Sequence, residues 1–106
     1  MLTISKNDQV QTVITTFDVT PANCDELLEV LKEACDSFVS KQAGFIGAAI
    51  HVNDARTRIA NYTQWKNRDD FQAMLRSEGM QMYHQKINEL CKSFAPVLYD
   101  VVSSVG

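Results

Sequence analysis

Residues 45–66, FIGAAIHVNDARTRIANYTQWK, contain the pattern that decides the fold. Phe45 to Val52 and Arg58 to Lys66 are rich in the β-branched and aromatic residues that favour strands. Asn53-Asp54 lies between them and supplies residues typical of a tight turn. The sequence therefore predicts two antiparallel strands joined as a hairpin.

The segment before this hairpin predicts a strand followed by a helix. Val10 to Val19 has the composition of a strand. Thr20-Pro21 is a typical helix start, and Asn23 with Glu26 three residues later is a competing start of the capping-box type. Apolar residues then recur at the i, i+3, i+4, i+7 spacing of a long amphipathic helix, until Gly44 interrupts the pattern.

The segment after the hairpin predicts a second helix and a last strand. Asn67 can cap the helix, which we expect to kink around residues 77–79 and to continue to Cys91. Phe94 to Val105 is the fourth predicted strand. The order β-α-β-β-α-β predicts an α+β, ferredoxin-like domain, with a four-stranded antiparallel sheet and both helices on one face.

Length and composition limit the classes of protein. A chain of 106 residues suits a single domain, here residues 1–106. The net charge of −3 and the scattered Lys and Arg residues exclude a typical nucleic-acid surface. No apolar run approaches the roughly 20 residues of a membrane span, and Met1 to Asp8 does not resemble a signal peptide. We therefore expect a cytoplasmic protein.

The cysteines and the last strand allow two further predictions. Cys24, Cys35 and Cys91 form no CxxC motif and have no histidine at a ligand-like spacing, so we predict reduced thiols and no metal site. The fourth strand is long and apolar, and an exposed edge of that kind invites pairing with another chain. We expect a homodimer that buries the face of each sheet opposite the helices.

The third strand places polar and aromatic groups together. Because side chains alternate, Ile59, Asn61, Thr63 and Trp65 point to one face. Asn61 and Trp65 are about 13 Å apart at roughly 3.3 Å per residue. That span suits a flat aromatic ligand held by an amide and an indole. From the spacing alone, a structural role, with Trp65 in the core and Asn61 bonded to a neighbour, is the favoured alternative.

Two histidines and several methionines are further candidates. His84 lies on the inward stripe of the second helix, where it is either a structural residue or a proton acceptor near neutral pH. His51 lies near the end of the second strand, as a surface residue or a ligand contact. Met74, Met80 and Met82 suit either an adaptable pocket wall or ordinary core packing.

The sequence Asn61-Tyr62-Thr63-Gln64-Trp65, followed by a capped helix and Phe71, resembles the antibiotic biosynthesis monooxygenase family. Gly44-Phe45-Ile46-Gly47 and His51 agree with this resemblance, which is strongest to the branch that oxidises anthrone-type intermediates to quinones without metal or flavin. The resemblance implies a dimeric α+β barrel with a pocket between sheet and helices. It also implies that the amide and indole hold the substrate and stabilise its deprotonated or oxygenated form.

The chain departs from that branch at several positions. Phe71 occupies the position of a Tyr in that branch, so a phenolic hydroxyl is missing. Gln85 lies near the position of the branch's helical Arg, so a cationic partner is missing unless Lys86 provides it. Haem-degrading relatives have a histidine at the position of His84. They also use an Asn on the first strand and a Trp on the second helix; both are absent here, and Met74 occupies the position of the Trp. Haem degradation is therefore the weakest alternative.

The leading hypothesis is a monooxygenase that needs no cofactor and oxidises a small aromatic, anthrone-like or quinol-like substrate with O₂. Asn61 would bind the developing oxyanion, Trp65 would stack on the ring and His84 would accept a proton. The predicted substrate contacts are Phe71, Met74, Tyr83 and His51. The alternative is a non-catalytic dimeric ligand-binding or stress-response protein on the same fold. A pocket lined by both Asn61 and Trp65 would favour the enzyme.

Overall fold

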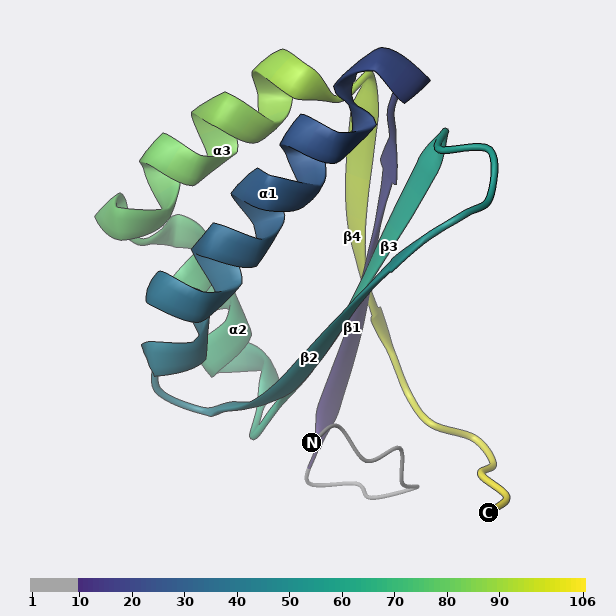
Figure 1. Ribbon diagram of the computed structural model, residues 1–106. Helices are drawn as coiled ribbons and strands as arrows, with labels where there is room; N and C mark the ends of the chain where they lie inside the picture. Colours follow the sequence, from purple (N-terminus) through teal and green to yellow (C-terminus); the bar gives the residue numbers. More distant parts are fainter. Residues whose placement is uncertain (1–9) are drawn as a thin grey trace.

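The computed structural model describes residues 10–106 and shows one antiparallel sheet with three helices packed on one of its faces (Figure 1). Residues 1–9, to which the prediction about a signal peptide applies, lie outside the described residues. The predicted ferredoxin-like order is confirmed, with the second helix divided in two. The elements are β1 (Gln11–Asp18), α1 (Pro21–Ser37), β2 (Phe45–Val52), β3 (Arg58–Trp65), α2 (Arg68–Arg76), α3 (Glu78–Leu90) and β4 (Ser93–Tyr99).

The β2–β3 hairpin forms as predicted, and its turn is held by one side chain. Asn53 Oδ1 accepts hydrogen bonds from the backbone N–H groups of Thr57 and Arg58, both at 2.9 Å. Asn53 Nδ2 also donates to Thr57 Oγ1 at 2.9 Å. These bonds satisfy backbone donors that would otherwise have no partner in the turn, which fixes the strand register.

The strand order in the sheet is β2-β3-β1-β4, so β3 has a neighbour on each side. Asn61, in the middle of β3, lies opposite Thr15 of β1 and Ile50 of β2. Residues directly opposite one another point to the same face of an antiparallel sheet. Thr15, Ile50 and Asn61 therefore share the face that the helices cover.

Helix α1 begins at Pro21, at the first of the two predicted starts, with Thr20 as its N-cap residue. Asn23, from the competing start, instead donates from Nδ2 to the Leu90 carbonyl oxygen at 3.3 Å. The helix ends at Ser37 and a short 3₁₀ turn follows before β2. Gly44 has a φ of +84°, and an added Cβ there would meet Asp70, so the interruption needs glycine.

The predicted kink in the second helix is a complete break at Ser77, which ends α2 and precedes the first residue of α3. Asn67 caps α2 as expected, because its Oδ1 accepts the backbone N–H of Asp70 at 2.8 Å. The break lets α2 and α3 cross the sheet in different directions (Figure 1). None of the helices among residues 10–106 is long and apolar enough to span a membrane.

The predicted length of the last strand is wrong. β4 ends at Tyr99, and residues 100–106 have no regular structure, although the sequence remains apolar to Val105. Tyr99 pairs with Thr12, close to the first residue of β1. The strand therefore ends where β1 stops providing backbone partners, which apolar composition alone does not reveal.

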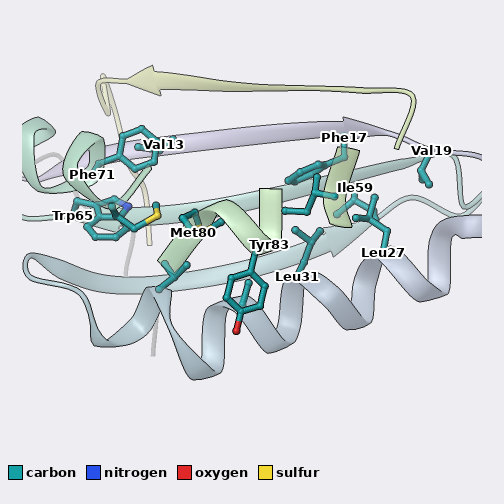
Figure 2. Close-up of a cluster of buried hydrophobic side chains, with 14 of the residues drawn as sticks. Val13, Phe17, Val19, Leu27, Leu31, Ile59, Trp65, Phe71, Met80 and Tyr83 are labelled. Carbon is teal, nitrogen blue, oxygen red and sulfur yellow. The ribbon is translucent and has the colours of Figure 1, made fainter. Parts of the chain in front are cut away.

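The core fills the space between the sheet and the helices (Figure 2). Trp65, Ile59 and Val13 from the strands are completely buried, as is Leu27 from α1. Trp65 and Phe71 lie next to each other at one end of this core (Figure 2). Burial of large apolar side chains at about 25 cal/mol per Å² is the main source of stability in a domain of this size.

Candidate active site

A small cavity lies between the helix-covered face of the sheet and α1, α2 and α3. Its volume is about 70 Å³. Apolar side chains form most of its wall, and the few polar groups come from three strands or helices. The residues that line it include Thr15, Cys35, Asn61, Thr63, Phe71, Met74, Met80, His84 and Phe94.

Asn61 is the most unusual polar residue of this wall. It is half-buried, and its Oδ1 atom is fully enclosed but accepts no hydrogen bond within residues 10–106. An unpaired buried acceptor typically costs about 1–3 kcal/mol. The alternative in which Asn61 bonds to a neighbouring residue therefore leaves this oxygen unexplained, whereas a bound ligand with a hydroxyl group would supply a partner.

Trp65 does not line the cavity. Its exposed fraction is 0%, and its ring packs between Phe45 at 5.6 Å and Phe71 at 5.8 Å, measured between ring centroids. Its Nε1–H donates to Thr63 Oγ1 at 3.1 Å. Trp65 thus occupies the core position that its structural role predicted. In this arrangement there is no space for a ligand to stack on its ring.

His84 lies at the boundary between the cavity and solvent. It is half-buried in α3, stacks on Phe94 with ring centroids 6.3 Å apart, and lines the cavity. It also lines a shallow polar hollow on the outer side of α3. Burial lowers the pKa of the His84 imidazole below its ordinary value of 6.5, because removal from water disfavours the charged form. The imidazole is therefore neutral at pH 7 and can accept a proton.

The four predicted substrate contacts divide into two pairs. Phe71 and Met74 line the cavity. Tyr83 is buried against Phe38, with ring centroids 6.2 Å apart, and does not line it. His51 is exposed on β2, opposite Ala60, and so points to the other face of the sheet. Asn61, His84, Phe71 and Met74 therefore share the cavity wall, whereas Trp65, Tyr83 and His51 are not part of it.

The two residues considered as replacements for a helical Arg also lie outside the cavity. Gln85 and Lys86 are both exposed on α3, and Gln85 lines the outer hollow instead. The described cavity wall therefore contains no side chain that is positively charged at neutral pH. An anion in this cavity depends on neutral hydrogen-bond donors.

Several lining residues had no predicted role. Thr63 shares the inward face of β3 with Asn61, so strand alternation was a usable signal. Thr15 of β1, Cys35 of α1 and Phe94 of β4 come from distant parts of the chain. Their meeting depends on strand order and helix packing, for which the sequence gives no local signal.

The three cysteines are free thiols in the structure. Burial raises the pKa of Cys35 and of Cys91 above the ordinary value, with a smaller contribution from Asp36 and Asp18 respectively. Both groups are therefore protonated at neutral pH and are weak nucleophiles. Within residues 10–106, no three His, Cys, Asp or Glu side chains gather as a potential metal site.

Comparison with known proteins gives a consistent result. The family model described as antibiotic biosynthesis monooxygenase matches residues 10–86. Tetracenomycin-F1 monooxygenase of Streptomyces glaucescens is 28% identical over 109 residues, which span 100% of this chain and 94% of that protein.

Solved structures agree with the fold. SnoaB, a cofactor-independent oxygenase from Streptomyces nogalater, superposes with a TM-score of 0.76 and 18% identity over 92% of this chain and 97% of its own. A conserved protein from Methanosarcina mazei Go1 superposes with a TM-score of 0.76 and 16% identity over 87% of this chain and 92% of its own. At these identities the superpositions establish the fold alone.

Proposed function

Because the chain belongs to the antibiotic biosynthesis monooxygenase family, we propose that it is a cytoplasmic, homodimeric monooxygenase that oxidises a small aromatic substrate with O₂ and without a bound cofactor. The proposed substrate resembles an anthrone or a quinol. Its ring supplies the electrons, so the protein needs to bind it, remove a proton and stabilise the resulting anion.

The observation that best supports this proposal is the Asn61 amide in the cavity wall. Its buried, unpaired Oδ1 indicates a polar group kept for a partner outside the chain. An amide offers a carbonyl that accepts and an N–H₂ that donates. Asn61 can therefore accept a bond from a substrate hydroxyl before deprotonation and, after rotation of the amide, donate one to the oxyanion.

His84 is the proposed proton acceptor. Its neutral imidazole takes a proton from an acidic C–H or O–H group of the substrate. The substrate anion transfers one electron to O₂, and the resulting radical and superoxide combine to form a C–O bond. Protonation of the peroxide, loss of the hydrogen that remains on the peroxide-bearing carbon and cleavage of the O–O bond give a quinone carbonyl and one molecule of water.

The position of His84 suits this proton transfer. One side of the residue lines the cavity and the other lines the hollow on the outer side of α3. A proton taken from the substrate can thus pass to water, and a proton for the peroxide can return by the same path.

The size of the cavity limits how the substrate binds. A cavity of about 150 Å³ in another protein holds benzene, and this cavity measures about 70 Å³. An aromatic substrate must therefore displace part of the wall. Met74 and Met80 are the suitable residues, because an unbranched thioether side chain adapts to a new shape at low cost.

The proposed homodimer rests on the face of the sheet that the helices leave open. Ile14 and Tyr62 on that face are half-buried, while Val97 and Tyr99 of β4 are 43% and 46% exposed. Apolar groups gathered on an uncovered sheet face are typical of a protein interface. A second copy of the chain would bury this face.

The small cavity also favours a second candidate function. A protein that binds a ligand without oxidising it needs no more than the adaptable wall and the Asn61 amide. Such a protein would bind an aromatic ligand but would not consume O₂, and this difference separates the two candidates.

The proposed oxidation is tested by measuring O₂ consumption with anthrone, 1,8-dihydroxyanthrone and hydroquinone. We expect the natural chain to exceed the uncatalysed background with at least one of them. Asn61→Ala should lower kcat/KM by about 100-fold, as the loss of one oxyanion donor does in other enzymes. Gln72→Ala, which removes an amide from α2 outside the cavity wall, is the matched control and should retain the rate.

Two results would contradict the oxidation. One is background O₂ consumption with every compound, although the compounds bind. The other is an equal rate for the natural chain and Asn61→Ala.

A further inference from the structure

The hydroxyl group of Thr63 has an unused donor in the cavity wall. Thr63 is 6% exposed and lines the cavity two residues from Asn61 on the same face of β3. Its oxygen accepts the Trp65 Nε1–H at 3.1 Å. A hydroxyl that accepts one bond still has one hydrogen to donate. Within residues 10–106 no acceptor takes that hydrogen.

The Trp65 bond holds the oxygen of this hydroxyl group in place. Trp65 is completely buried and held by Phe45 and Phe71, so its N–H group cannot turn to another partner. The indole N–H can only donate, so the hydroxyl hydrogen is available to another acceptor. In addition, a donated bond polarises the hydroxyl, which strengthens the next bond in the chain.

Asn61 and Thr63 are suitably spaced to bind one oxygen atom. Two residues apart on a strand, their Cα atoms are separated by roughly 7 Å. Two donors on opposite sides of a single oxygen are about 5–6 Å apart, since each bond is close to 2.9 Å. Both side chains can therefore reach one atom in the cavity without a change in the strand.

The cavity gives such a pair a particular use. No positively charged side chain lines the described wall, so an anion there relies on neutral donors. Hydroxyl donors form short, strong bonds to oxyanions, especially where water is excluded.

We infer that Thr63 is a second oxyanion donor beside Asn61, and that Trp65 is a positioning residue that acts through Thr63 without touching the substrate. This inference deepens the proposed function and depends on it for the identity of the anion, a phenolate-like oxygen of the substrate. Trp65 thus contributes to anion binding from within the core, which accounts for its absence from the cavity wall.

The test uses 4-nitrophenol as a probe, because its phenolate absorbs visible light and its phenol does not. Bound to the natural chain, the probe should ionise at a lower pH than in water. Thr63→Val keeps the shape but removes the hydroxyl, and it should weaken phenolate binding by about 10-fold while phenol binding stays within 2-fold, the effect of one lost charged hydrogen bond. Thr63→Ser restores a hydroxyl and should recover most of the preference.

The role of Trp65 is tested with Trp65→Phe and the double variant. Trp65→Phe should lose part of the phenolate preference, and adding it to Thr63→Val should cause no further loss, because the two groups act in one chain. Trp65 is the sole tryptophan in the sequence, so its indole N–H gives a single NMR signal. That signal should shift when 4-nitrophenolate binds to the natural chain and should not shift in Thr63→Val.

The outcomes separate this inference from the proposed oxidation. The inference is overturned if the natural chain does not bind the probe, if Thr63→Val retains the phenolate preference, or if it weakens phenol and phenolate equally. Additive effects of Thr63→Val and Trp65→Phe would overturn the role of Trp65. Failure of the oxidation would instead appear as absent O₂ consumption alongside an intact phenolate preference.

Discussion

At the scale of single residues, the chemistry of the site depends on where a side chain ends and which atoms surround it. Asn61 and His84 both line one small cavity, although they come from β3 and α3. The cavity is largely apolar, so each polar group in it has a large effect on a bound anion or proton.

The burial of His84 leads to a prediction about pH. Its pKa lies below 6.5, and only the neutral imidazole accepts a proton. The rate of O₂ consumption should therefore rise as pH increases through a midpoint below 6.5 and stay level near neutral pH. His84→Gln should remove this acidic limb and lower the plateau by about 100-fold, as removal of a general base does elsewhere.

His51→Gln is the control for this pH profile, because His51 is the other histidine of the chain and is exposed on the opposite face of the sheet. It should retain the acidic limb. The same variant assigns the imidazole NMR signals, from which the His84 pKa is measured directly. A His84 pKa above 6.5 would contradict the effect of burial on this group, and an acidic limb that persists in His84→Gln would exclude His84 as the base.

At the scale of elements, the site depends on the junction between β3 and α2. β3 ends at Trp65, Asn67 caps α2, and Phe71 and Met74 follow on the buried side of that helix. Because the cap fixes the first turn, it also fixes where Phe71 meets Trp65.

The cap provides a prediction about stability. Asn67→Ala removes the 2.8 Å bond to the Asp70 N–H and should reduce the free energy of unfolding by about 1 kcal/mol. Thr20→Ala is a matched control, since Thr20 is the N-cap residue of α1 but forms no side-chain capping bond. It should change the free energy by less than half as much. Urea denaturation of both variants measures the difference, and equal losses would contradict a specific role for the Asn67 cap.

At the scale of the whole molecule, the three helices of residues 10–106 lie on one face of the sheet and leave the other face open (Figure 1). The cavity is on the helix-covered side and the proposed dimer contact is on the open side. Dimerisation would therefore stabilise the sheet that carries Asn61 without covering the cavity.

The dimer is tested by placing a charge on the open face. Val97→Arg puts a cation where the second copy would pack and should shift the protein from dimer to monomer in sedimentation equilibrium, because an unpaired buried charge is strongly unfavourable. Met82→Arg is the matched control, since Met82 is 57% exposed on α3, away from the sheet. It should leave the mass unchanged. A natural chain that is monomeric at micromolar concentration would contradict the dimer.

Local features were predictable because their physical causes lie within short stretches of the chain. The β2–β3 hairpin follows from two strand-like segments and the Asn53 turn, and the α2 start follows from Asn67. Alternation along β3 correctly placed Asn61, Thr63 and Trp65 on one face, and the helix-covered side contains all three. The sequence also predicted an irregularity around residues 77–79, but as a kink in one helix and not as the complete break found at Ser77.

The remaining features depend on residues far apart in the sequence. Whether an inward side chain lines a cavity or packs tightly is decided by its neighbours from other elements, and Phe45 and Phe71 enclose Trp65. The length of β4 depends on where β1 begins. The sequence by itself thus determined the order of elements and the inward face of β3. The tertiary structure decided that Asn61 and His84 line the same cavity while Trp65 bonds to Thr63, because burial is a property of the packed whole.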